Sequence, residues 1–308
     1  MAETVVDAPT RPRDNLWQRA CQGHLVPVTV VVLAIIVVWY AAAIYLNAPQ
    51  VIDRFARAKQ DWSASELVGA TWSMDRPVLP APHQVVAELK KSIFDIRITS
   101  RRSLVYHAWV TMSATVVGFV MGAVLGVLLA VGIVHLRTFD RSLLPWIIAS
   151  QTVPILAIAP MIVVVLGNLG LTGLLPKAII SMYLCFFPVT IGMVKGLRSP
   201  EALQLDLMRT YSASPAQIFW KLRWPAALPF LFASLKVAIA ISLVGAIVGE
   251  LPTGAVAGIG ARLLTGSYYG QTVQIWAALV MASVLGVSLV AAVGLIERLV
   301  LRAMGGRP

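Results

Sequence analysis

The chain of 308 residues has few charged residues, cysteines or histidines. Only 13% of its residues are charged while 58% are hydrophobic, which is more apolar surface than a soluble core of this length needs. Its two cysteines are Cys21, before the first apolar run, and Cys185, inside a later one, so neither a disulfide framework nor a cysteine metal site is expected. The composition therefore predicts a multi-pass membrane protein.

Catalytic and nucleotide-binding signatures are also lacking. The histidines are scattered over loops and the ends of apolar runs, without a paired carboxylate or a second ligand at useful spacing. No glycine-rich phosphate loop ends in Lys-Ser or Lys-Thr. We expect no catalytic site, metal or cofactor on this chain, and any ATP and magnesium would bind to another subunit.

Six apolar runs are long enough to cross a bilayer, and they predict an all-α integral membrane protein with six transmembrane helices. The runs cover residues 25–46, 108–135, 143–167, 174–194, 226–250 and 272–296. The first reads as a retained signal anchor. The expected parts are a tail at 1–24, the first span at 25–46, an extracytoplasmic excursion at 47–107, a core at 108–300 and a tail at 301–308.

The net charge of +11 is distributed as a topology signal rather than as a nucleic-acid patch. Basic residues gather in the segments 137–141, 195–223 and 298–307, whereas the short loops near 168–173 and 251–271 contain only Arg262. By the positive-inside rule, both termini and the 195–223 segment are predicted to be cytoplasmic.

Small residues form a stripe in the second run, where Gly118, Gly122 and Gly126 follow one another at intervals of four. Small residues at this spacing allow membrane helices to pack closely. We therefore expect this face to contact a neighbouring helix.

Ionisable groups inside the apolar runs are few, so those present are informative. The candidate residues for a solute path are Gln151, Thr152, Pro154, Glu250 and Thr253. Pro154, together with Pro160, is expected to kink the third run. Two roles stay open for Glu250: it lines the path, or it pairs with Arg262 or Lys236. Lys236 by itself is expected to reach the cytoplasmic surface.

A polar stretch at 199–229 separates two apolar runs. Ser199-Pro200-Glu201 predicts the start of one short amphipathic helix, and the capping box Ser214–Gln217 starts a second, which Pro225 is expected to end. Such a pair suits either a docking surface for a partner or an interfacial helix resting on lipid headgroups.

The same stretch resembles the cytoplasmic EAA loop of ABC-importer permeases. The loop pattern is Glu-Ala-Ala, three residues, Gly, nine residues, then Ile-x-Leu-Pro, and its positions here read Asp206-Leu207-Met208, Ser212 and Leu222–Pro225. The spacing is kept, although only the proline is identical. The resemblance covers about residues 78–300 and is strongest to the nitrate, sulfonate and taurine branch. Its further matching segments are 79–82, 153–160, 187–188, Glu250 and 295–298.

This resemblance implies a permease of the bacterial inner membrane that pairs with itself. It would bind two ATPase subunits through a coupling loop at 196–225 and receive a small solute from an extracytoplasmic binding protein. The solute would be of the sulfonate, nitrate or taurine type, or a heterocycle such as a pyrimidine or flavin precursor. The ATPase-coupling residues it implies are Glu201, Asp206, Leu207, Met208, Tyr211, Ser212, Ala213 and Pro225.

Two other classes of function remain. A membrane scaffold could recruit a cytoplasmic partner through the same loop without moving a solute. An intramembrane enzyme could use Glu250 with a histidine, although no such pair stands at catalytic spacing in the sequence.

Overall fold

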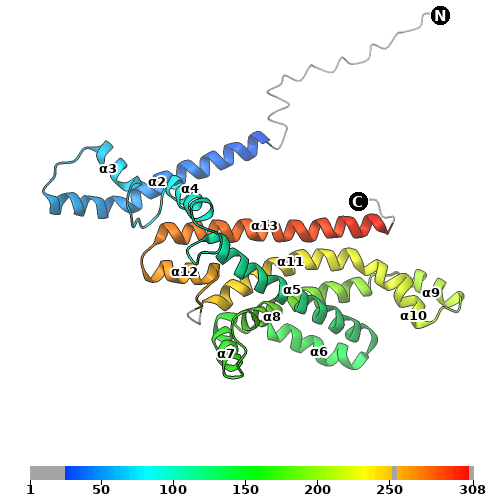
Figure 1. Ribbon diagram of the computed structural model, residues 1–308. Helices are drawn as coiled ribbons and strands as arrows, with labels where there is room; N and C mark the ends of the chain where they lie inside the picture. The colour runs from blue at the N-terminus through cyan, green and yellow to red at the C-terminus, as the bar shows by residue number, and fades with distance from the viewer. Residues whose placement is uncertain (1–24, 252–254, 305–308) are drawn as a thin grey trace, which may run out of the picture. The chain divides into compact units, whose positions relative to one another are not determined.

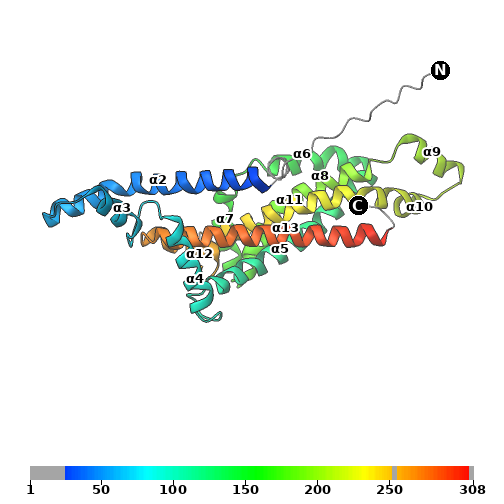
Figure 2. The same ribbon diagram turned by 90° about the horizontal axis from the view of Figure 1, so that it is seen from above.

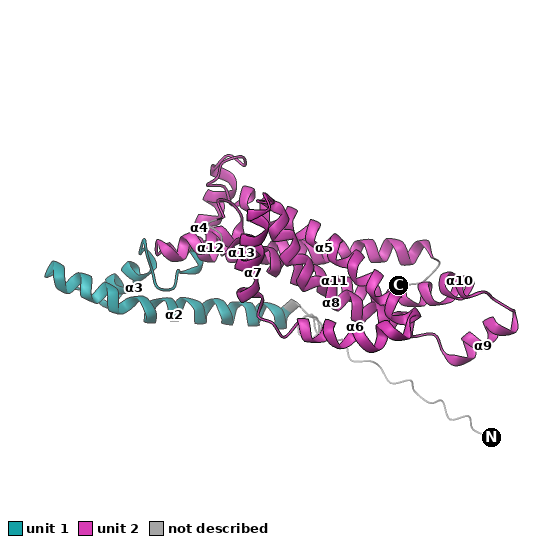
Figure 3. Ribbon diagram, turned by 90° about the horizontal axis from the view of Figure 1, so that it is seen from below, with its two compact units in different colours: residues 1–84 teal, residues 85–308 magenta. Residues whose placement is uncertain are grey.

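The computed structural model describes residues 25–251 and 255–304, and every regular element in these ranges is a helix (Figure 1). The chain divides into two compact units, residues 1–84 and 85–308 (Figure 3). Thr253, the tail at 1–24 and the end of the second tail lie outside the described residues.

Unit 1 is built on the long helix α2 (Leu25–Ala58), followed by α3 (Ala64–Trp72). The helix continues past the predicted end at residue 46, because a later segment of unit 1 packs on its second half. Asn47 is fully buried there: its Nδ2 donates to the carbonyl of Leu79 at 2.9 Å, and its Oδ1 accepts from the N–H of Val78 at 2.8 Å. A polar residue that looks like the end of an apolar run thus joins the helix to the following loop.

Unit 2 contains the remaining helices. In chain order they are α4 (Pro82–Lys90), at whose start the boundary between the units falls, η1 (Lys91–Asp95), α5 (Leu104–His135), α6 (Arg137–Ser150), α7 (Ile155–Asn168), α8 (Leu174–Leu197), α9 (Ala202–Thr210), α10 (Pro215–Ile218), η2 (Phe219–Arg223), α11 (Trp224–Glu250), α12 (Ile259–Tyr268) and α13 (Thr272–Ala303). Among the described residues of both units, five helices are long and apolar enough to cross a membrane, or six if α6 and α7 count as one broken span.

The predicted third span is bent by 98° between α6 and α7. The bend falls at residues 151–154, where a kink was expected, and Pro154 adopts an extended conformation at the start of α7. Pro160 lies inside α7 and does not mark the break. Extended backbone around Pro154 therefore explains the bend better than the second proline does.

The centre of unit 2 is the packing of α5 and α11 against α8. The expected close approach of the glycine stripe is confirmed: a Cβ on Gly122 would lie 2.2 Å from the Sγ of Cys185. Hydrogen bonds join α11 to both other helices: Ser181 of α8 donates to the carbonyl of Ser242 on α11, and Ser242 donates to the carbonyl of Thr115 on α5, both at 2.9 Å. Small residues bring the backbones together, and short hydroxyl side chains then satisfy carbonyl groups across the gap.

Replacing Gly122 with valine is expected to destabilise unit 2 by about 1–3 kcal/mol, because the added atoms overlap Cys185 and the backbone of α8. Thermal unfolding of the purified protein in detergent measures the loss. Gly69→Val is the matched control, since a Cβ on Gly69 of α3 meets nothing within 4 Å. An equal melting temperature for both variants would contradict this packing.

Candidate functional site

The short helix α9 carries an exposed apolar stripe. Leu203, Leu207 and Tyr211 follow at intervals of four, and they are 77%, 56% and 76% exposed. Figure 1 and Figure 2 show α9 and α10 at one end of unit 2, with α12 towards the other end. Three large apolar side chains on one helical face, open at the tip of a bundle, form a surface suited to a partner.

The start of α9 differs from the prediction. Glu201 is its N-cap, and the Oε1 of Gln204 accepts from the N–H of Glu201 at 3.1 Å. Ser199 instead donates its hydroxyl to the carbonyl of Gly196 at the end of α8. The expected serine cap therefore serves the preceding helix, and a capping-box contact from Gln204 starts α9 two residues later.

The end of α9 is a Schellman turn, a closure that usually requires glycine. The N–H of Ala213 donates to the carbonyl of Met208 at 3.0 Å, and the N–H of Ser212 donates to that of Arg209 at 2.8 Å. Ser212 has a φ of 51°, in the left-handed region. Ser212 stands where the EAA pattern has glycine, so the turn geometry is present while the residue that favours it is absent.

Ser212→Gly is expected to stabilise this turn by about 1 kcal/mol, because a side chain in the left-handed region costs about 1–2 kcal/mol. The gain corresponds to roughly fivefold slower hydrogen exchange of the Ala213 amide. Ser212→Val should speed that exchange, since a β-branched residue is strained at this φ. Equal exchange in all three proteins would contradict this account of the turn.

The second capping box is confirmed. Ser214 is the N-cap of α10, its N–H donates to the Oε1 of Gln217 at 2.8 Å, and its hydroxyl accepts from the N–H of Gln217. The prediction that Pro225 ends this helix is wrong. A π-helical turn, η2, carries the chain into α11, where Pro225 occupies the first turn and needs no N–H partner. The loop is therefore joined to α11 by helical backbone.

Asp206 lies on the exposed surface of α9 and forms an ion pair with Arg209, with Oδ1 and Nη1 3.0 Å apart. An exposed pair of this kind adds at most about 1 kcal/mol to stability. Both charges are therefore available to a partner at little cost to the fold.

A buried polar group lies at the C-terminal end of α11, far from the 196–225 loop that precedes this helix. Glu250 is fully buried, and its carboxylate accepts from the hydroxyl of Thr111 on α5 at 3.0 Å and from the N–H of Gly260 on α12 at 2.8 Å. The Nζ of Lys177 on α8 completes an ion pair with it at 3.3 Å. One carboxylate thus joins four helices.

The segment before α12 is held by the same buried cluster, which consists of Glu250, Lys177 and Thr111 together with His107. The N–H of Gly258 donates to the Nδ1 of His107 at 2.9 Å, the N–H of Ile259 donates to Thr111 at 2.8 Å, and Lys177 donates to the carbonyl of Ala257 at 3.0 Å. Gly258 has a φ of 128°, and a Cβ there would lie 2.1 Å from the carboxyl carbon of Glu250. Only glycine fits this approach of loop backbone to carboxylate.

Glu250 pairs with neither Arg262 nor Lys236, the two partners expected from the sequence. Its partner is Lys177, while Lys236 forms an ion pair with Glu297. Arg262 lies on α12, where burial lowers the pKa of its guanidinium and the Glu88 carboxylate opposes that shift. An ionisable residue inside the predicted run 174–194 was the signal that could have found Lys177.

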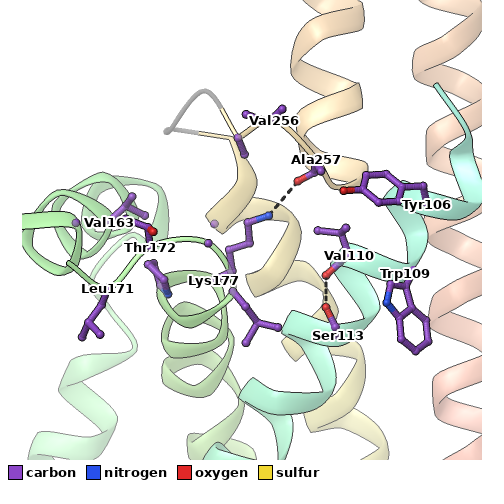
Figure 4. Close-up of a pocket in the computed structure, with 16 residues that line it drawn as sticks. Tyr106, Trp109, Val110, Ser113, Val163, Leu171, Thr172, Lys177, Val256 and Ala257 are labelled. Atoms are coloured by element: carbon purple, nitrogen blue, oxygen red, sulfur yellow. Dashed lines mark hydrogen bonds between the residues drawn. The ribbon is translucent and has the colours of Figure 1, made fainter. Parts of the chain in front are cut away.

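A cavity of about 710 Å³ adjoins this cluster (Figure 4). Tyr106, Val110 and Ser113, on one face of α5, line it together with Lys177 and with residues 255–257. The α6–α7 break lies elsewhere: none of Gln151, Thr152 and Pro154 belongs to the described wall of this cavity. Glu250, which adjoins the cavity, and residues 151–154, at the α6–α7 break, therefore lie in two different places.

The described part of the chain is a helical, multi-pass membrane protein, and its unit 2 has an exposed helical loop at one end and a buried ion pair towards the other. Residues 122–305 match the family described as binding-protein-dependent transport system inner membrane component. The chain belongs to this family. It is accordingly a non-enzymatic permease subunit of the ABC type, and ATP hydrolysis belongs to a separate subunit.

Relatives in this family carry names for several solutes. The chain is 30% identical over 73% of its length to the formylaminopyrimidine transport permease protein ThiX of Halalkalibacterium halodurans, covering 85% of that protein. It is 29% identical over 73% to the riboflavin transport system permease protein RibX of Chloroflexus aurantiacus, covering 80%. It is 26% identical over 77% to the putative aliphatic sulfonates transport permease protein SsuC of Bacillus subtilis, covering 82%. The expected resemblance to the sulfonate branch of ABC permeases is thereby confirmed.

Proposed function

We propose that this chain forms the membrane path of an ATP-driven importer for a small solute. It sits in the bacterial inner membrane with both termini in the cytoplasm, pairs with a second copy, and receives its solute from an extracytoplasmic binding protein. The single observation that carries the proposal is the exposed stripe of Leu203, Leu207 and Tyr211 on α9. A tight turn joins this capped helix to α10, from which η2 leads into α11. The family membership supports the same assembly.

In this proposal the loop at 196–225 docks the ATPase dimer. Leu207, Met208 and Tyr211 would enter a groove on the ATPase, and Asp206 would contribute charge at the rim. The remaining proposed members of the docking surface are Glu201, Ser212, Ala213 and Pro225. A helix buries such a stripe efficiently because residues four apart lie on one face.

Movement of α9 would then travel along α11. This helix has 27 residues, about 40 Å at 1.5 Å per residue, and it ends at Glu250 in the buried cluster. A closing ATPase dimer could therefore shift the cluster by displacing a single helix. Within the proposed core at 108–300, Glu250 supports the wall of the solute path. The further residues proposed for this path are Gln151, Thr152, Pro154 and Thr253.

Replacing Asp206 with lysine is expected to lower solute uptake driven by ATP severalfold while the chain still inserts and folds, because the reversed charge faces the docked ATPase. Uptake and ATP hydrolysis measured together on the reconstituted complex give the coupling ratio. Asp95→Lys is the matched control, since Asp95 is an exposed acid on η1, outside the docking loop. An unchanged ratio for Asp206→Lys would remove Asp206 from the proposed surface.

A scaffold that recruits a cytoplasmic partner without transport is the second candidate, and the exposed stripe is compatible with it. It predicts that partner binding persists with no solute crossing the membrane. Uptake by the reconstituted complex separates the two, since only a permease moves solute when ATP is supplied on the loop side.

A further inference from the structure

The cavity beside Lys177 has a wall whose charge is compensated. Among the described residues that line it, Lys177 is the one charged side chain. The ammonium of Lys177 lies 3.3 Å from the Oε1 of Glu250 and 3.0 Å from the carbonyl of Ala257. Glu250 itself is fully buried behind the wall and bound from two further sides. The positive charge therefore has a fixed counter-ion within the protein.

The rest of the wall is apolar or weakly polar. Val110, Val256 and Leu174 supply aliphatic surface, Tyr106 supplies an aromatic ring, and Ser113 donates its hydroxyl to the carbonyl of Val110. Figure 4 shows the Lys177 side chain extended along this wall to Ala257. A volume of about 710 Å³ falls within the range that holds drug-sized ligands.

Such a wall discriminates by charge. An oxyanion entering the cavity would lose hydration and find no uncompensated cation, so its transfer from water would be unfavourable. An uncharged ring compound would bury apolar surface against the valines and the tyrosine, and an ammonium with three N–H groups, two of them used, can donate a hydrogen bond to a ring nitrogen or carbonyl.

We infer that this cavity is a solute site of the permease and that it takes uncharged, ring-containing solutes rather than free sulfonate or nitrate. The inference rests on the proposed transport function and narrows its solute class. The Lys177–Glu250 pair sets the selectivity, because removing the carboxylate would leave a cation at the wall.

Thiol labelling tests the charge of this wall without a known substrate. Cysteines introduced as Val110→Cys or Ser113→Cys, in a chain carrying Cys21→Ser and Cys185→Ala, are labelled in nanodiscs with the ATPase subunit bound. The probes are benzyl, sulfonatoethyl and trimethylammonioethyl methanethiosulfonate, which are neutral, anionic and cationic, and rates are divided by those with a free thiol. The neutral probe is expected to react about tenfold faster than the anionic one.

Adding Glu250→Gln is expected to raise the ratio of anionic to cationic rates about tenfold, because the Lys177 charge is then uncompensated. The double change Lys177→Gln with Glu250→Gln removes both charges and should restore the original ratio. No labelling at either position, or fastest labelling by the anionic probe when Lys177 and Glu250 are both intact, would overturn the inference. ATPase binding is measured on the same samples, so a failed cavity and a failed transport assembly are told apart.

Discussion

Lys177→Met is expected to destabilise unit 2 by about 3–5 kcal/mol, the largest effect of any single change considered for this chain. The methionine removes the cation and leaves the carboxylate of Glu250 fully buried, with hydrogen bonds but no counter-ion. An uncompensated buried charge is the costliest defect in a packed interior. Thermal unfolding in detergent, followed by the loss of monodisperse protein on size exclusion, measures the effect.

The double variant Lys177→Met with Glu250→Met separates the charge from the packing. Without either ion there is no buried charge to compensate, so most of the lost stability should return. Lys236→Met is a useful comparison, because its partner Glu297 is partly exposed and the cost should be smaller. If Lys177→Met and Lys236→Met unfold at the same temperature, the buried cluster does not stabilise unit 2 as proposed.

Tyr211→Ala is expected to weaken binding of the ATPase subunit about thirtyfold, equivalent to about 2 kcal/mol, because large aromatic side chains dominate the energy of docked surfaces. Tyr211 is 76% exposed in the free chain and ends the apolar stripe of α9, so its truncation should not disturb the fold. Affinity is measured by titrating the ATPase subunit onto the chain in nanodiscs.

The control for this change is Phe94→Ala. Phe94 is exposed to a similar extent, at 78%, but lies on η1, outside the docking loop. Its truncation should leave the affinity unchanged. An equal loss of affinity for both variants would indicate a nonspecific effect and would contradict the assignment of α9 as the docking surface.

Most helices could be predicted from local features of the sequence, because composition and neighbouring residues determine where a helix forms. Apolar runs located five long apolar helices, whereas the run at 143–167 forms the bent pair α6 and α7. The glycine stripe predicted that α5 packs closely on a neighbouring helix, which is α8. The Ser214 capping box was predictable for the same reason, since it involves residues three apart. Pro225 was wrongly predicted to end α10. The sequence pattern does not reveal the π-helical turn η2, which leads into α11 with Pro225 in its first turn.

The buried cluster was not predictable from local patterns. Glu250 pairs with a residue 73 positions earlier, and nothing in the spacing distinguishes Lys177 from Lys236 or Arg262 as its partner. The helix packing determines which residue pairs with Glu250. Small residues let α5, α8 and α11 approach closely enough for Thr111, Lys177 and Glu250 to come into contact.

The most direct test of the account is whether the α9 loop holds the ATPase subunit. Residues 201–213 are replaced by a Gly-Ser segment of equal length, and retention of the ATPase subunit by the chain in nanodiscs is compared with that of the unaltered chain. The account predicts that the unaltered chain retains the subunit and the variant does not, although both insert and fold. Equal retention by the two chains would contradict it.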